Sequence, residues 1–419
     1  MDLINIYLMD MTYVNNTSGV DRYMYSLIEG LKQRKDIAIY WIRLSNDPKL
    51  FLQQEETGER FTKITFPMPQ RKQEIIDSRF WMRKYNEQIY RLISHLFVGK
   101  SNCILHINTV NLIDLALLIR KYVCCKIISH LHCIPWKGYY DRDRFWFNQL
   151  YEKVYINEDS GINPDEFLSN NCEKEFYMEA DKVICVTHCA SSFLSKIMEV
   201  PKEKIVIIPN GIQDFYSDIV LDIPFIKKEI SLLYVGTVSQ SKGLDFILKA
   251  LRQVKRAGYV TKLNVVGYIP PTLQIKYEQE NKDLSISFLR RINFEELEII
   301  YRKSDIGIIA SLQEQCSYAA IEMCMFGLPI ITTAVDGLDE IFTDEVDALK
   351  VDVCFSLRIG LRVDIDGMSE RIIRLIKSPL LRQSLGRQAR MLYLQYFTLQ
   401  RMIEKTTTLY KQLLKGVGL

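Results

Sequence analysis

The sequence predicts an α/β protein built from two doubly wound domains, each with a parallel sheet between helices. Short β-rich runs alternate with amphipathic stretches of helical length, which is typical of successive βαβ units. The alternation occurs in two blocks, because the stretch 212–229 has no clear period and contains a proline. At roughly 150 residues per domain, two domains are the simplest organisation for a chain of 419 residues.

The first block holds six predicted strands. They are Leu3 to Met9, Ile37 to Leu44, Cys103 to Asn108, Lys126 to His132, Lys182 to Val186 and Lys204 to Ile208. Helical spacing predicts helices between them, for example over Asp21 to Lys32 and over Ala190 to Met198.

The second block repeats this pattern. Its predicted strands are Leu232 to Val238, Lys262 to Val266, Ile286 to Leu289, Asp305 to Ser311, Leu328 to Thr333 and Ala348 to Val353. From Asp366 onward the pattern is helical, with breaks expected at Pro379 and over 395–398. Doubly wound sheets bind ligands at the carboxyl ends of their strands, so two facing sheets would form a cleft, where we expect the chemistry.

Two segments depart from the plain alternation. The segment 70–100 is basic and aromatic, with apolar residues at approximately helical spacing. Two interpretations stay open for it: a helix packed on the first sheet with a solvated basic face, or a helix that docks on a membrane surface or grips a substrate. The segment 136–171 is long, aromatic and acidic, which suits an insertion over the mouth of the cleft or an ordinary helical excursion.

The composition is that of a globular protein. Hydrophobic residues make up 48% and charged residues 25%, which excludes disordered, collagen-like and disulfide-scaffold chains. Lys and Arg total 54 against 51 Asp and Glu, and a net charge of +3 argues against nucleic acid as the main partner.

The location expected from the sequence is cytoplasmic. The ten cysteines form no CxxC pair, and several lie in apolar runs, such as Cys103, Cys185 and Cys189, which predicts reduced, buried thiols. The first residues carry no basic region before their apolar stretch, so no secretory signal is expected. Charged residues interrupt the most apolar window, 112–131, and no transmembrane helix is expected.

The densest group of candidate functional residues lies between Ser311 and Ile331. The order strand, loop, helix, turn and strand places Glu314 in the loop, Ser317 at the helix N-cap and Glu322 one to two turns into the helix. Helical side chains lean toward the amino terminus, so Glu322 can point back toward that end. A helix amino terminus suits a phosphate and carboxylates suit hydroxyls, so this arrangement could hold a sugar nucleotide, although a solvated helix residue is an equal interpretation of Glu322.

A family resemblance makes this interpretation more specific. A Glu, seven residues and a second Glu, followed by Gly and Pro before an apolar strand, resembles the donor-site motif of family 4 retaining glycosyltransferases with the GT-B fold. Other segments agree in order and spacing. Residues 18–23 resemble the family's glycine-rich first loop, and 180–186 and 207–212 resemble the segments that close its acceptor domain. Residues 234–251 resemble the first strand, loop and helix of its donor domain, including the phosphate-contacting lysine, here Lys242. Residues 390–414 resemble its terminal helices.

The resemblance implies a domain plan. An acceptor-binding Rossmann-like domain would span 1–215, a nucleotide-sugar donor-binding domain 216–395, and a helix over 396–419 would cross back to the first domain. It also implies a cytoplasmic enzyme of the hexosyltransferase type.

The resemblance also implies roles for individual residues. Glu314 would contact the donor sugar and Glu322 the ribose, while Lys242 would neutralise the diphosphate. The N–H groups near Gly19, Ser317 and Tyr318 would help Lys242, and Gly236 and Arg290 complete the expected donor-binding set. A Lys with a helix terminus can stabilise the departing nucleoside diphosphate without metal, so no cofactor is expected beyond the nucleotide sugar, with UDP favoured over GDP. A front-face retaining mechanism is the family's usual proposal.

The sequence departs from the family pattern at two places. The residue after Gly236 is often Arg in the family but is Thr237 here, so one expected phosphate charge is missing. Arg290 and Arg291 follow a predicted strand where the family often has Gly. They could restore that charge, alter nucleobase recognition or simply lie on the surface.

All five histidines fall in the first block. His130 and His132 are two residues apart on one predicted strand, so they share a face. No carboxylate or cysteine has the spacing of a metal ligand beside them, and we predict no metal site. His132 resembles the family's active-site histidine near the donor sugar and is, with Glu314, the expected catalytic residue.

Three classes of function can be compared with the sequence. The leading one is transfer of a sugar to a glycan, lipid-linked or peptide acceptor, with peripheral contact at the inner face of the membrane through 70–100 left open. The alternative is a non-catalytic partner subunit that keeps the fold and binds a glycosyltransferase or acceptor. A nicotinamide-dependent oxidoreductase ranks last, because neither the strand at Leu3 nor that at Leu232 is followed by GxGxxG.

Overall fold

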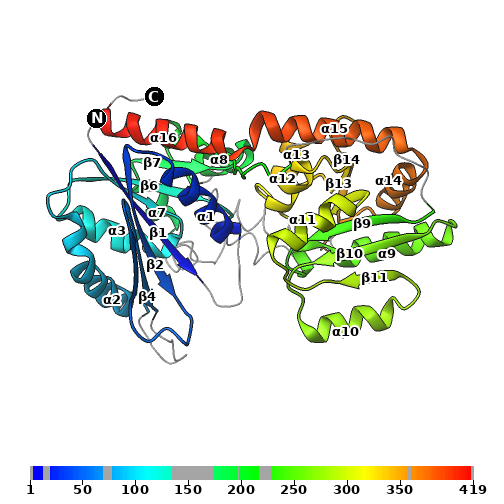
Figure 1. Ribbon diagram of the computed structural model, residues 1–419, viewed down its shortest axis with the longest axis horizontal. Coiled ribbons are helices and arrows are strands. Elements are labelled where there is room, and N and C mark those ends of the chain that lie inside the picture. Colours follow the sequence, from blue (N-terminus) through cyan, green and yellow to red (C-terminus); the bar gives the residue numbers. More distant parts are fainter. Residues whose placement is uncertain are drawn as a thin grey trace, which may run out of the picture. The chain divides into compact units, whose positions relative to one another are not determined.

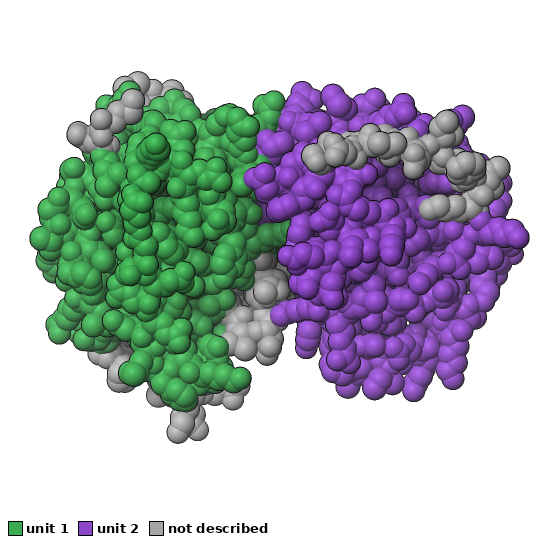
Figure 2. Space-filling model, in the orientation of Figure 1, with its two compact units in different colours: residues 1–132, 157–211, 399–419 green, residues 133–156, 212–398 purple. Residues whose placement is uncertain are grey.

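The chain forms two compact units, each with its own sheet (Figures 1 and 2). The structure is a computed structural model that describes residues 3–12, 19–68, 78–134, 173–196, 198–216, 228–356 and 360–416. Unit 1 comprises 1–132, 157–211 and 399–419, and unit 2 comprises 133–156 and 212–398. The predicted insertion at 136–171 lies entirely outside the described residues.

The described residues of unit 1 contain an eight-stranded sheet, parallel except at one edge. Its order is β3 (Gln54–Gly58), β4 (Phe61–Pro67), β2 (Ile37–Ser45), β1 (Ile4–Thr12), β5 (Cys103–Ile107), β6 (Cys125–Leu131), β7 (Lys182–Cys185) and β8 (Ile205–Ile207). Strand β3 runs antiparallel to β4, as an edge hairpin that the alternation of βαβ units does not predict. The six predicted strands are all present, and no end differs from the prediction by more than three residues.

Helices cover both faces of this sheet. In the register of β1 and β5, Tyr7 lies beside Leu105 and Leu8 beside His106, so Tyr7 and His106 face opposite sides. The Tyr7 side carries α2 (Ser78–Ile93) and η1 (Ser94–Phe97), because the Tyr7 hydroxyl donates to the Leu96 carbonyl at 2.8 Å. The His106 side carries α1 (Gly19–Lys32) and α16 (Leu399–Lys415), whose Tyr410 contacts His106. The remaining helical elements of unit 1 are η2 (Val110–Leu112), α3 (Ile113–Arg120), α7 (Glu173–Met178), α8 (His188–Lys196) and η3 (Lys202–Lys204).

Helix α2 is amphipathic, as the spacing in 70–100 predicts. Ile89 and Ile93 are buried, while Arg83, Lys84 and Arg91 are exposed. This burial is what a helix packed on the sheet with a solvated basic face requires. Residues 69–77 lie outside the described part.

The described residues of unit 2 contain a six-stranded parallel sheet. Its order is β11 (Ser285–Phe288), β10 (Thr261–Val266), β9 (Ile230–Val235), β12 (Ile306–Ile309), β13 (Ile330–Thr333) and β14 (Leu349–Val351). Its helices are η4 (Gln240–Lys242), α9 (Leu244–Arg256), α10 (Pro271–Glu280), α11 (Phe294–Lys303), α12 (Tyr318–Met325), α13 (Asp336–Ile341), α14 (Ile365–Lys377) and α15 (Pro379–Tyr396). A separate hairpin joins β15 (Val353–Ser356) and β16 (Gly360–Val363).

The core of unit 2 is aliphatic, as expected for strands buried on both faces. Leu232, Leu263 and Ile306 are fully buried on adjacent strands. Helix α9 adds Ile247 and Leu251, which lie one turn apart on its apolar stripe. The break expected over 395–398 separates α15 from α16, as predicted.

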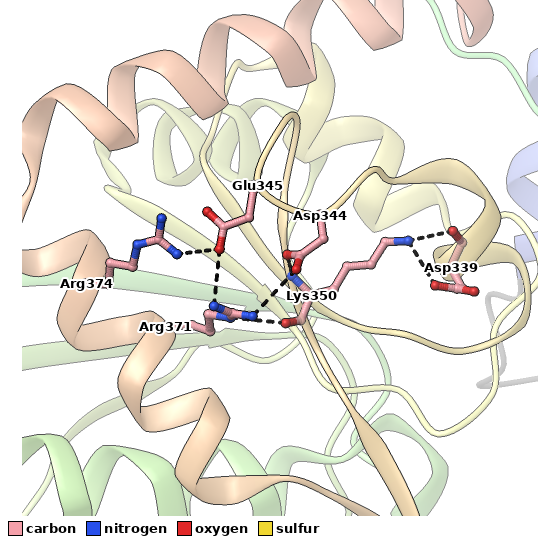
Figure 3. Close-up of polar contacts among 6 residues, drawn as sticks. All are labelled: Asp339, Asp344, Glu345, Lys350, Arg371 and Arg374. Carbon is pink, nitrogen blue, oxygen red and sulfur yellow. Dashed lines mark hydrogen bonds and ion pairs between the residues drawn. The ribbon is translucent and has the colours of Figure 1, made fainter.

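A network of charged side chains ties the last strand of this sheet to α14 (Figure 3). Arg371 donates to the Lys350 carbonyl at 3.2 Å and pairs with Asp344 and Glu345, at 3.5 and 3.2 Å. Arg374 pairs with the same Glu345 oxygen. The Lys350 ammonium in turn lies 2.9 Å from an Asp339 carboxylate oxygen of α13.

The described cysteines are free thiols, and the expectation of burial is wrong for Cys124, Cys133 and Cys354, which are exposed. Cys103 and Cys185 are buried as predicted. The prediction of burial is wrong for Cys189, which is half-buried, because it lies in the first turn of α8 instead of inside a strand.

Candidate functional site

The loop after β9 is held against the loop after β12. Gly243 adopts φ +70°, and a Cβ placed there would lie 2.0 Å from the carbonyl oxygen of Ala310. The Leu312 N–H donates to the Ser241 carbonyl at 2.8 Å. Glycine is therefore required at this turn, which fixes Lys242 immediately before α9.

Lys242 and Glu314, two of the predicted donor-site residues, form an ion pair. The side chain of Lys242 is one-third exposed and that of Glu314 is 18% exposed, so both remain accessible. The Glu314 carbonyl accepts from the Gly337 N–H at 2.9 Å, and a Cβ at Gly337 would lie 1.6 Å from the Gln315 carbonyl oxygen. The loop that carries Glu314 is therefore held from two sides.

Helix α12 begins beside this loop. The Ser317 side chain accepts from the Ala320 N–H, as the predicted N-cap, so Tyr318 is the first helical residue. The first N–H groups of a helix are unpaired within it and carry a partial positive charge, which favours an anion. This end of α12 therefore combines anion-binding character with the nearby ammonium of Lys242.

Glu322 lies one turn into α12 and is 1% exposed. The Tyr301 hydroxyl of α11 donates to Glu322 Oε2 at 2.6 Å, and the Tyr301 ring stacks on Phe326, with centroids 4.8 Å apart. The interpretation of Glu322 as a solvated helix residue is therefore wrong, because the carboxylate is buried and hydrogen-bonded.

Gly236, Thr237 and Arg290 lie at the same edge of the sheet of unit 2. A Cβ at Gly267, the residue after β10, would lie 2.1 Å from the Gly236 carbonyl oxygen, and the Gly267 N–H donates to the Arg290 carbonyl at 2.9 Å. Thr237 and Arg290 are exposed, and Arg290 has φ +23°, in the region that favours glycine. Strand β11 is two strands from β9, about 10 Å away. All three interpretations of Arg290 stay open: it restores the missing charge, alters nucleobase recognition or simply lies on the surface.

The predicted residues of unit 1 are Gly19 and His132. Gly19 begins α1, two residues earlier than the helix start that the sequence predicts. His132 follows β6, half-buried, and its ring stacks on His130 with centroids 3.9 Å apart. Parallel stacked rings do not converge on one point, and within the described residues no group of three or more His, Cys, Asp and Glu could hold a metal ion.

The sequence does not predict three sets of polar contacts in the structure. Tyr301 is one, because nothing in the pattern of α11 marks its hydroxyl for Glu322. Asn108 is another: it ends a predicted strand, and a polar residue at that place was an available signal. The third is a buried group in which Arg43 pairs with Asp10 and Asp21, with burial raising the pKa of Asp10 to about 6.

Comparisons with known proteins place these features in a family. The fold and the loops at the strand ends define an α/β protein of the GT-B class, with two Rossmann-like domains. Residues 17–214 match the family model described as Glycosyltransferase Family 4, and residues 221–391 match Glycosyl transferases group 1. The chain belongs to the family 4-like glycosyltransferases with the GT-B fold.

Curated relatives are similar over part of the chain. An uncharacterized glycosyltransferase of Methanocaldococcus jannaschii is 26% identical over 210 residues, 47% of this chain and 52% of the relative. A D-inositol 3-phosphate glycosyltransferase of Segniliparus rotundus is 24% identical over 196 residues, 43% of each chain. The match spans about half the length of these relatives.

Solved structures are similar over nearly the whole chain. Sucrose-phosphate synthase from Thermosynechococcus elongatus superposes with a TM-score of 0.73 and 18% identity, over 99% of this chain and 100% of that one. Anabaena HepE, solved with UDP and glucose, superposes with a TM-score of 0.67 and 12% identity, over 98% and 100%. At these identities the likeness shows the fold alone.

Proposed function

We propose that the protein moves a sugar from a nucleotide-sugar donor, with UDP favoured, to a glycan, lipid-linked or peptide acceptor. The observation that carries this proposal is the Lys242–Glu314 pair beside the amino terminus of α12. A cation and free helix N–H groups suit a diphosphate, and carboxylates suit sugar and ribose hydroxyls. HepE, which shares the fold, was solved with UDP and glucose, which favours UDP in the proposal.

The proposed mechanism retains the anomeric configuration and uses no metal. The bond between the sugar C1 and the diphosphate oxygen breaks, and a bond from C1 to the acceptor oxygen forms on the same face. The acceptor proton passes to the departing phosphate oxygen. Negative charge grows on the leaving diphosphate, where Lys242 and the α12 N–H groups would stabilise it. Glu314 and His132 would contact the donor sugar, and Glu322 the ribose.

The test is calorimetric titration of UDP, GDP, ADP and sugar nucleotides, with and without EDTA. We expect selective, EDTA-insensitive binding that weakens about 10- to 100-fold in Lys242→Ala, since a hydrogen bond to a charged group contributes about 1.5–3 kcal/mol. Lys249→Ala is the matched control, because Lys249 is an exposed lysine seven residues further along the chain, on α9. Glu322→Gln should also weaken binding, and the exposed Glu370→Gln should not.

The alternative function is that of a non-catalytic partner subunit. The exposed Thr237, at a position where Arg is common in the family, favours this alternative. If no nucleotide binds under any condition, the donor-site proposal is wrong and the partner role becomes the leading one. Binding without any transfer to a broad acceptor set would keep the donor site and remove the transferase role.

The proposed location is the cytoplasm, with peripheral contact at the inner face of the membrane as a separate prediction. No helix among the described residues is long and apolar enough to cross a bilayer. Vesicle binding that weakens with salt and in Arg83→Glu/Lys84→Glu would support contact through α2. Binding that ignores both changes would rule out that surface.

A further inference from the structure

Three histidine rings of unit 1 lie in a row on one face of its sheet. His106 belongs to β5, His130 to β6, and His132 follows β6. The rings of His106 and His130 are parallel with centroids 5.5 Å apart, and those of His130 and His132 are 3.9 Å apart. The Tyr23 ring of α1 meets all three edge-on, at 4.5–6.4 Å.

Asn108 has a fixed orientation beside this row. Its backbone N–H donates to the Met9 carbonyl at 2.8 Å, and its side-chain Nδ2 donates to the His106 carbonyl at 3.3 Å. Asn108 Oδ1 therefore faces the other way, 2.9 Å from His132 Nε2. An amide oxygen can only accept, so this contact requires the proton of His132 to lie on Nε2.

The surroundings of His132 keep its imidazole neutral. The ionisable groups that face it in the described residues are Tyr23 from α1, His106 from β5 and His130 from β6. None of them is an anion near neutral pH, and burial, with a smaller contribution from His106, lowers the pKa of His132. Neutral His132 with its proton on Nε2 has a bare Nδ1, which can only accept a hydrogen bond.

We propose that Asn108 is a positioning residue that holds His132 in the Nε2-protonated tautomer, so that Nδ1 accepts a hydrogen bond from a hydroxyl of the donor sugar. This inference rests on the proposed function, which places His132 against the donor sugar. It also defines the sugar group at this position. A hydroxyl can donate to the bare Nδ1, whereas a carboxylate cannot, so the substituent of the sugar that meets Nδ1 is a hydroxyl and not a carboxylate.

The first experiment reads the tautomer directly. Long-range ¹H–¹⁵N correlation spectra of histidine-labelled full-length protein, assigned with His132→Gln, distinguish a protonated from a bare ring nitrogen. We expect a protonated Nε2 and a bare Nδ1 for His132 between pH 6 and 8. A proton on Nδ1, or an imidazolium in this range, would overturn the proposal whether or not the protein binds any nucleotide.

The second experiment uses Asn108→Asp, which keeps the shape and places a carboxylate at Nε2. An opposite charge in contact favours the imidazolium, so the pKa of His132 should rise by at least about one unit. The acid limb of the donor-hydrolysis pH profile, with the nucleotide sugar identified by calorimetry, should move to higher pH by the same amount. Tyr410→Phe is the control, because its hydroxyl lies 2.7 Å from His106 Nδ1 and does not contact His132.

These experiments test the positioning role of Asn108 separately from the proposed transferase function. An unchanged His132 titration in Asn108→Asp, or an equal change in Tyr410→Phe, would show that Asn108 does not set the state of His132. If the pKa of His132 rises as expected in Asn108→Asp but no nucleotide sugar reacts, the positioning contact stands and the proposed function fails. If Asn108→Asp does not fold, the wild-type spectrum still decides the tautomer.

Discussion

Gly243 combines two constraints that can be separated by substitution. Its φ of +70° favours glycine, and its missing side chain leaves room for the Ala310 carbonyl. Gly258 has a similar φ of +88°, but a Cβ there would meet nothing within 4 Å. The two positions therefore share the backbone constraint and differ in the contact.

We predict that Gly258→Ala costs about 1–2 kcal/mol of unfolding free energy, the cost of a left-handed conformation for a residue with a Cβ. Gly243→Ala should cost more and should also weaken nucleotide binding, because the clash moves the turn that carries Lys242. Urea unfolding and calorimetric titration of both variants measure the two effects. Equal losses of stability with unchanged binding in Gly243→Ala would contradict the role assigned to this turn.

The part of the site that could be read from the sequence is the part encoded locally. Glu314, Ser317 and Glu322 follow one another along a strand, loop and helix, so spacing alone places them. The contact of Tyr301 with Glu322 joins α11 to α12, and that of Asn108 with His132 joins β5 to the end of β6. Such contacts depend on how elements pack, which the periodicity of one segment does not contain.

At the scale of elements, the parallel strands were predictable because each is a short, continuous apolar run. Strand β3 is an element that this pattern does not predict. Its residues Gln54–Gly58 are all exposed and contain no apolar side chain, so neither alternation nor an apolar run marks them. They are extended because they pair with β4, which is a property of the hairpin and not of their own sequence.

The charged network of Figure 3 gives a prediction at this scale. Arg374→Ala should cost less than about 1 kcal/mol, because it removes only an exposed ion pair with Glu345. Arg371→Ala should cost about 1–2 kcal/mol, because Arg371 also donates to the Lys350 carbonyl of β14.

Urea unfolding at low and high salt measures this difference. High salt should reduce the effect of Arg374→Ala more than that of Arg371→Ala, since screening weakens exposed pairs and leaves a backbone hydrogen bond. Equal costs for the two variants, with equal sensitivity to salt, would show that the link to β14 adds no stability.

For the whole molecule, the buried histidines predict how stability depends on pH. Burial lowers the pKa of His106 from 6.5 to about 3, and burial with the neighbouring histidines lowers that of His130. Between pH 6.5 and about 3 these histidines are protonated in the unfolded chain but neutral in the folded chain, so stability falls as the pH falls. Asp10 opposes this between about 6 and 3.8, since its folded pKa is raised.

We expect the histidines to dominate, with unit 1 losing stability from pH 6.5 downward by up to about 1.4 kcal/mol per pH unit for each buried histidine. His106→Gln removes one titrating group and should flatten this slope, even if it lowers the stability at pH 7. Denaturant unfolding at a series of pH values compares the two slopes. Parallel slopes in the variant and the wild type would contradict a buried neutral His106.

The position of helix α16 in the sequence affects how unit 1 folds during synthesis. Its Tyr410 contacts His106, its Ile403 fills the space beside Gly30 of α1, and its Met402 accepts from the Gly211 N–H. These contacts belong to unit 1, whereas residues 212–398 belong to unit 2. Because α16 follows unit 2 in the sequence, the His106 face of the unit 1 sheet is covered only in part, by α1, until α16 has been synthesised, and during that interval unit 1 exposes apolar surface that a chaperone would bind.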